Sequence, residues 1–96
     1  GIEAMTTIRV EKEAEGRFAV FVREGRSQSR HVVSLTAEYL QKLTGGKVVA
    51  EELIRCSFEF LLEQEPKESI LHQFDLPVIS RYFPEYEREI RRRLGT

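Results

Sequence analysis

Histidine and serine residues that could support acyl transfer lie close together in the first third of the chain. His31 has three serines within four residues, Ser27, Ser29 and Ser34. Nucleophilic catalysis by serine requires a base, a carboxylate that orients the base, and an oxyanion hole. The sequence has no G-x-S-x-G turn and no glycine-rich strand-to-helix loop. The immediate neighbours of His31 point to the opposite face of a strand, so we predict no catalytic residue and a partly buried His31.

Three further residue types could bind a metal ion. They are His72, Asp75 and Cys56. A zinc site needs three or four ligands in a set geometry, and nothing here repeats at the required spacing. Cys56 stands between apolar residues, where a small thiol is ordinary packing, and Asp75 is placed to cap a short helix. The sequence therefore predicts neither a metal site nor a cofactor.

Acidic side chains follow one side of a predicted helix, and they are Glu52, Glu59 and Glu63. Paired carboxylates can perform acid–base chemistry when a desolvating cleft perturbs their pKa values. These three occupy the one polar side of an otherwise apolar helix, which predicts a solvated face.

A basic cluster near the end of the chain consists of Arg88, Arg91, Arg92 and Arg93. Arginines can neutralise phosphates, but no aromatic residue follows Tyr86 to stack on bases. The helix dipole and the i, i+4 pairs Glu87–Arg91 and Glu89–Arg93 already account for this charge pattern.

The element around which the chain is organised is a predicted helix over residues 48–64. At 100° per residue the apolar positions cover an arc of roughly 200°, which is typical of a buried helix. These positions are Val49, Ala50, Leu53, Ile54, Cys56, Ser57, Phe58, Phe60, Leu61 and Leu62. Charges interrupt the helix every few residues, so it is not a membrane span.

Three segments before this helix alternate between apolar and polar residues, as half-buried strands do. They cover residues 6–13, 17–24 and 29–35, with Gly16 suited to a tight hairpin turn. The second segment is apolar on both sides and is predicted to lie in the middle. His31, Val33 and Leu35 are expected on the core face. Short connections favour pairing between neighbours, so we predict a three-stranded antiparallel meander.

Several short helices are predicted around the central one. Thr36 is a suitable N-cap for a helix over residues 37–43, which Gly45 and Gly46 would end. One or two helical turns are expected at 67–71, and Pro84 is expected to open a last helix. The pattern leaves open whether residues 69–83 form one helix or two. The predicted fold is α+β, with four or five helices on one sheet face.

Length, composition and charge limit the class of protein. The chain has 96 residues, of which 41% are apolar and 32% charged, with a net charge of −1. These values suit one soluble globular domain with no general attraction to nucleic acid. A single cysteine and the lack of a signal or membrane segment favour the cytoplasm. Residues 1–4 precede Met5 and are interpreted as additions for expression, which leaves one domain over residues 5–96.

A contact patch is predicted on the sheet face assigned to solvent. Phe21 and Val32 are its apolar members, and the arginines predicted to contact a partner beside them are Arg23 and Arg30. An aromatic residue with an arginine rim is the composition of a protein–protein contact. The edges of the first and third strands offer a second route, strand addition between copies.

Residues 31–64, HVVSLTAEYLQKLTGGKVVAEELIRCSFEFLLEQ, resemble the ribbon-helix-helix DNA-binding family. The shared pattern is a strand with alternating residues, a helix, a glycine turn and a second helix. This resemblance implies a dimer whose paired strands enter the major groove of DNA. Arg30, Val32 and Ser34 would then face the bases.

The favoured hypothesis is a small non-enzymatic domain that binds a protein partner or a second copy of itself, most simply as a homodimer. The alternative is a dimeric DNA-binding regulator of the ribbon-helix-helix type.

Overall fold

An antiparallel meander opens the fold, as the alternating segments predict. The computed structural model describes residues 5–96, so the interpretation of residues 1–4 lies outside the described part of the chain. Strand β1 (Thr6–Ala14) pairs with β2 (Arg17–Glu24), and β2 pairs with β3 (Ser27–Ser34). Gly16 has a φ of 74° in the first turn, a conformation that side chains disfavour. Strand β2 lies between the other two, as predicted.

A short fourth strand was not predicted. Strand β4 (Gln73–Asp75) pairs in parallel with β3, and the sheet order is β1-β2-β3-β4. The backbone N–H of Val32 donates to the carbonyl of His72 at 2.7 Å. Strand β3 is therefore covered by β4 over Val32–Ser34, and the prediction that its edge is open was wrong for this stretch.

The segment on either side of β4 is neither one helix nor two. A 3-10 turn (Lys67–Ser69) precedes β4, and another (Leu76–Val78) leads into the short helix α3 (Ile79–Tyr82). The side chain of Asp75 makes no capping hydrogen bond and accepts one from Ser34 on β3 instead. Asp75 stands at the N-cap position of the second turn as predicted, but the prediction that its side chain caps a helix was wrong, because its carboxylate joins two strands.

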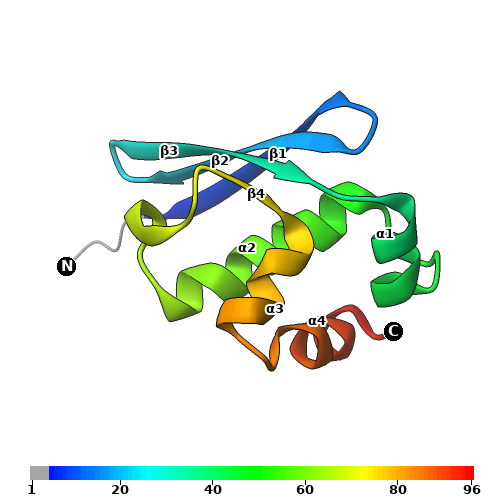
Figure 1. The fold of residues 1–96 in the computed structure, drawn as a ribbon. Coiled ribbons are helices and arrows are strands. Elements are labelled where there is room, and N and C mark those ends of the chain that lie inside the picture. The colour runs from blue at the N-terminus through cyan, green and yellow to red at the C-terminus, as the bar shows by residue number, and fades with distance from the viewer. Residues whose placement is uncertain (1–4) are drawn as a thin grey trace.

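Helix α2 (Ala50–Gln64) crosses one face of the sheet and forms the centre of the core (Figure 1). Ile54, Phe58 and Phe60 are at most 2% exposed, so the predicted burial of this helix is confirmed. The helix begins at Ala50 and not at residue 48, because Val49 is extended and 66% exposed.

The predicted core face of the sheet is also confirmed. His31 and Val33 are completely buried, and Leu35 is almost so. Val33 and Leu35 belong to one cluster of sheet and helix residues, which includes Ile8, Phe18, Val20, Val22, Leu53 and Leu61. The His31 ring packs against Phe58, with 5.4 Å between ring centres.

Helix α1 (Ala37–Thr44) begins and ends where its caps predict. The hydroxyl of Thr36 accepts from the Tyr39 N–H at 3.0 Å, and Gly45 adopts the left-handed conformation with a φ of 64°. Helix α4 (Tyr86–Leu94) begins two residues after Pro84 and packs against α2. Tyr86 and Ile90 are the buried residues of α4. The helices thus occupy one side of the sheet (Figure 1).

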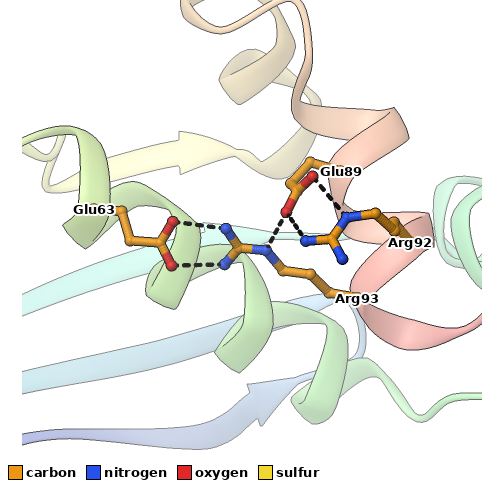
Figure 2. Close-up of polar contacts among 4 residues, drawn as sticks. All are labelled: Glu63, Glu89, Arg92 and Arg93. Atoms are coloured by element: carbon orange, nitrogen blue, oxygen red, sulfur yellow. Dashed lines mark hydrogen bonds and ion pairs between the residues drawn. The ribbon is translucent and has the colours of Figure 1, made fainter.

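The C-terminal arginines connect α4 to α2 (Figure 2). Both terminal nitrogens of Arg93 donate to Glu63 on α2, at 2.6 and 2.9 Å, and its Nε donates to Glu89 at 2.8 Å. Arg92 also donates to Glu89. Of the two predicted i, i+4 pairs, Glu89–Arg93 is present.

The second predicted pair, Glu87–Arg91, is replaced by contacts to α1. Glu87 accepts a hydrogen bond from the Tyr39 hydroxyl at 2.8 Å and pairs with Lys42 at 3.5 Å. Arg91 donates to the Lys42 carbonyl. Both charged residues thus fasten α4 to a neighbouring helix.

Candidate functional site

The outer face of the sheet is not covered by any helix of residues 5–96 (Figure 1). Phe21 lies at its centre, directly between Arg9 on β1 and Arg30 on β3 in the register of the strands. The guanidinium carbon of Arg9 lies 4.4 Å from the centre of the Phe21 ring, and that of Arg30 lies 5.8 Å away. Two cations therefore flank one half-exposed aromatic ring, a favourable arrangement for both.

Charged residues of both signs surround this ring, and they form ion pairs with one another. Arg9 pairs with Glu11 at 2.8 Å, and Glu13 pairs with Arg30 at 2.6 Å and with Arg17 at 3.6 Å. All five side chains are substantially exposed, so these pairs add little stability. The ion pairs do hold the positive and negative groups at defined positions on the face.

The four predicted contact residues share this face. Phe21 and Arg30 are directly opposite each other on β2 and β3. Val32, which is half-buried, is the next residue of β3 on the same face. Arg23 lies in the next row towards the β2–β3 turn, where its Nε donates to the Gly25 carbonyl at 3.0 Å. The face thus has an apolar centre with a charged rim.

Strand β1 forms a long edge of the sheet. Within residues 5–96 it pairs with β2 alone, and the carbonyl of Ile8 points away from β2 to accept a hydrogen bond from Arg55 on α2. Because N–H and C=O of one antiparallel residue point to the same side and alternate along the strand, Ile8, Val10 and Lys12 direct their backbone groups outward. The opposite edge is β4, which has only three residues.

A serine–histidine pair lies inside the domain. Ser29 Oγ is 2.8 Å from His31 Nε2, and His31 Nδ1 is 2.8 Å from the Leu71 carbonyl. A carbonyl only accepts, so Nδ1 carries the proton and Nε2 accepts from the serine. The sequence argument considered the immediate neighbours of His31, but Ser29 is two positions away and shares its face.

This pair lacks the arrangement of a hydrolase dyad. A backbone carbonyl, and not a carboxylate, orients the imidazole of His31, which is completely buried. Burial lowers the pKa of His31 below its ordinary value, against the opposing effect of the Leu71 carbonyl. A neutral histidine that joins β3 to the segment before β4 is a structural bridge.

Lys67 is a buried polar residue that the sequence did not indicate. Its side chain is 3% exposed, and Nζ donates to Ser27 at 2.5 Å and also to Glu68. Glu24 lies 3.5 Å away. The hydrogen bond to Glu68 raises the pKa of Lys67, so the amine stays charged and closes the end of the β2–β3 hairpin.

The three possible metal ligands do not converge. His72 stacks on His31 with 5.7 Å between ring centres, Asp75 binds Ser34, and Cys56 is buried on α2. Burial raises the pKa of the Cys56 thiol. Within residues 5–96 no three histidine, cysteine or acidic side chains form a metal-binding group.

The residues that the ribbon-helix-helix resemblance assigns to DNA also lie on the outer face. Arg30 pairs with Glu13, and Ser34 donates to Asp75. In that family the strand pairs with the same strand of a second chain. Here β2 and β4 occupy both edges of β3, so that pairing would require β4 to leave the sheet.

The three glutamates on the polar side of α2 differ in their contacts. Glu52 and Glu59 are exposed, and Glu63 holds Arg93 in a two-point contact that lowers the pKa of the Glu63 carboxyl. The polar side of α2 is therefore exposed to solvent, and Glu63 connects it to α4.

An apolar groove of about 160 Å³ lies between α2, β4 and α3. Phe74 and Ile79 form part of its wall, and Leu71 and Tyr82, which are 47% and 66% exposed, also line it. Its lining is mainly apolar, with few polar groups to orient a ligand.

Comparison of the chain with protein-family models, with curated proteins and with solved structures found no match. None of the helices in residues 5–96 combines the length and the apolar character needed to cross a bilayer.

Proposed function

We propose that this domain is a non-enzymatic protein-interaction module whose first partner is a second copy of the chain. The observation that carries the proposal is the one-sided fold: the helices pack on the inner face of the sheet, and within residues 5–96 no helix covers the outer face and no further strand pairs with the long β1 edge. Open edges present unpaired N–H and C=O groups that readily accept another strand.

The central helix does not supply the reason for association. Its apolar residues, among them Leu53, Ile54 and Phe58, are covered within residues 5–96. The central helix therefore needs no second copy to cover it, and the proposal depends on the open sheet.

The outer face has the composition of a contact surface. Phe21 is a rigid aromatic anchor between two arginines, and aromatic residues and arginine are enriched at the energetically important positions of interfaces. The surrounding charges are of both signs, which favours a partner that also carries both signs over one of a single sign.

Light scattering coupled to size exclusion, from low micromolar to millimolar protein, tests the proposal. We expect the mass to rise with concentration from 11.2 kDa towards twice that value. A mass that stays at the monomer value over the whole range would overturn the proposed function.

A second candidate is DNA binding, favoured by the four arginines that face outward from the sheet, Arg9, Arg17, Arg23 and Arg30. Three of them are already paired with glutamates of the same face. We expect no association with random duplex DNA at low salt. Association that weakens steeply as salt rises would support the DNA-binding candidate instead.

A further inference from the structure

The β1 edge is self-complementary in one register. We propose that two copies pair antiparallel through β1 about a two-fold axis at Val10, which joins their sheets into one continuous sheet. This proposal rests on the proposed self-association and specifies the surface that carries it.

The backbone geometry supports pairing at this position. The Ile8 carbonyl points outward to Arg55, and the Val32 N–H points from β3 to the segment of β4. In an antiparallel sheet, successive residues of a strand direct their backbone N–H and C=O to opposite sides. Starting from Ile8, or from Val32 across the paired strands, this rule places the N–H and C=O of Val10 on the free edge. In the proposed pair each Val10 donates to the other and accepts from it.

The edge is regular over the stretch that the pairing uses. Pairing between β1 and β2 runs without interruption from Thr6 to Lys12, and the irregularity follows between Lys12 and Ala14. A bulge twists a strand away from a regular ladder, and residues 8–12 come before it, so they form a regularly paired segment centred on Val10.

Charge fixes the register. With the axis at Val10, Arg9 of each copy stands opposite Glu11 of the other, on the outer face. The Arg9 and Glu11 positions are then non-hydrogen-bonded pairs, in which the Cα atoms are only about 4.5 Å apart and side chains meet closely. Opposite charges across strands stabilise such pairs.

The neighbouring registers are less favourable. An axis at Arg9 or at Glu11 places two like charges directly opposite each other, and an axis at Lys12 pairs Glu11 with Glu13. An axis at Ile8 places Arg9 opposite the uncharged Thr7. Only the axis at Val10 matches opposite charges without also matching like ones.

Arg9 already makes two contacts within its own copy. Its guanidinium lies over the Phe21 ring at 4.4 Å and bonds Glu11 of its own strand at 2.8 Å. A guanidinium has five N–H donors in a planar fork, so the bond to Glu11 leaves donors for a carboxylate of the second copy. The Phe21 side chains of the two copies would then lie on either side of the two paired β1 strands.

The inner face accommodates the second copy as well. Val10 is half-buried at the edge of the core and would meet Val10 of the second copy. Lys12 of the second copy would lie opposite Ile8, beside the hollow that Glu59 and Glu63 help to line. The Ile8 carbonyl has two lone pairs, so it can accept from both Arg55 and the second copy.

Cross-linking tests the register in a chain whose one native cysteine is replaced by the Cys56→Ala change. In the proposed dimer the Cα atoms of the two Val10 residues are about 5.5 Å apart, a separation that a disulfide spans. Val10→Cys should therefore form covalent dimers on mild oxidation. Lys12→Cys is the matched control, since its two copies would stand roughly 14 Å apart.

Charge reversal provides an independent test. Glu11→Arg alone, or Arg9→Glu alone, places like charges opposite each other and should raise the dimer dissociation constant about tenfold or more. The double variant Arg9→Glu/Glu11→Arg should restore it, and the exposed Glu38→Arg should leave it unchanged. Circular dichroism checks that each variant is folded.

The outcomes separate the two proposals. A wild-type chain that stays monomeric overturns the proposed function and this pairing together. A wild-type dimer in which Lys12→Cys cross-links as readily as Val10→Cys, or in which the charge reversals have no effect, overturns the Val10-centred pairing and leaves self-association standing.

Discussion

Tyr86 and Ser57 form a buried polar contact between α4 and α2. The two hydroxyl oxygens are 2.6 Å apart, and the serine also donates to the Leu53 carbonyl at 2.8 Å. The tyrosine must therefore donate to the serine. Burial raises the pKa of Tyr86, which keeps this donor protonated.

The direction of this hydrogen bond predicts unequal costs for its two deletions. Tyr86→Phe leaves Ser57 bonded to Leu53 and should lower the free energy of unfolding by about 1 kcal/mol. Ser57→Ala leaves the buried tyrosine hydroxyl without an acceptor and should cost about 2–3 kcal/mol. Urea denaturation of both single variants and the double variant measures the difference. Equal costs that simply add would contradict the proposed direction.

His31 makes stability depend on pH. Burial lowers its folded pKa below the unfolded value of 6.5, so the unfolded chain takes up the proton more readily. The neutral histidine thus stabilises the fold fully above pH 6.5, and this contribution falls as the pH drops from there towards the folded pKa.

A His31→Gln variant should have a free energy of unfolding that depends less on pH than that of the wild type. We expect a wild-type decline in the free energy of unfolding below about pH 6.5 and a shallower decline in the variant. Urea denaturation at several pH values compares the two slopes. Parallel slopes in the two proteins would show that another group causes the decline.

At the scale of elements, Glu89 couples the C-terminal arginines to each other and to α2 (Figure 2). Hydrogen bonds from Arg92, and then from Arg93, lower the pKa of Glu89 to about 2. A depressed folded pKa means that the carboxylate contributes stability above its ordinary pKa of 4.5. This contribution is lost as the pH falls through about 2.

Glu89→Gln should therefore weaken the acid dependence of stability. We expect the variant to be less stable than the wild type above pH 4.5, and the difference to shrink as the solution is acidified. Thermal unfolding across that range measures it, with the exposed Glu38→Gln as control. A difference that persists unchanged down to pH 2 would assign the effect to packing and not to charge.

Strand β4 is short and depends on its one buried side chain. Phe74 is 9% exposed and lies 6.1 Å from Phe58, centre to centre. Phe74→Ala should destabilise the domain by about 3 kcal/mol. It should also speed exchange of the Val32 amide, which is bonded to the His72 carbonyl. Unchanged Val32 exchange would mean that β4 stays docked without its anchor.

The meander and the central helix could be predicted because their signals are local. Alternation placed His31, Val33 and Leu35 on the core face, and the arc of α2 correctly indicated that Ile54 and Phe58 are buried. Both patterns are repeated over many positions, so a single atypical residue does not erase them.

Strand β4 and the Lys67 contacts could not be predicted, because distant residues create them. Three residues are too few to show alternation, and β4 exists because β3 offers an edge some forty residues earlier in the chain. Lys67 is a surface residue by type, and only the neighbouring Ser27 and Glu24 make its burial tolerable.

The candidate site was predictable in part for the same reason. Strand alternation placed Phe21, Val32 and Arg30 on one face, and the structure has them there. It could not show that Arg9 stacks on Phe21, since that contact depends on the register between β1 and β2. The Ser29–His31 contact could have been found from the same-face spacing of two.

At the scale of the whole molecule, the fold is asymmetric. Within residues 5–96 one face of the sheet is covered by helices and the other is left to charged side chains around Phe21. The β1 edge lies at the boundary between these two sides. A second copy that pairs along this edge would extend both layers at once, since its helices would continue the helical side.

Amide hydrogen exchange of Val10 as a function of protein concentration tests this account most directly. In the monomer the Val10 N–H faces solvent, so it should exchange rapidly when the protein is dilute. We predict that its exchange slows at high concentration, while the exchange rates of the amides of α1, which are not on the β1 edge, stay the same. Val10 exchange that stays equally rapid at all concentrations would contradict the account.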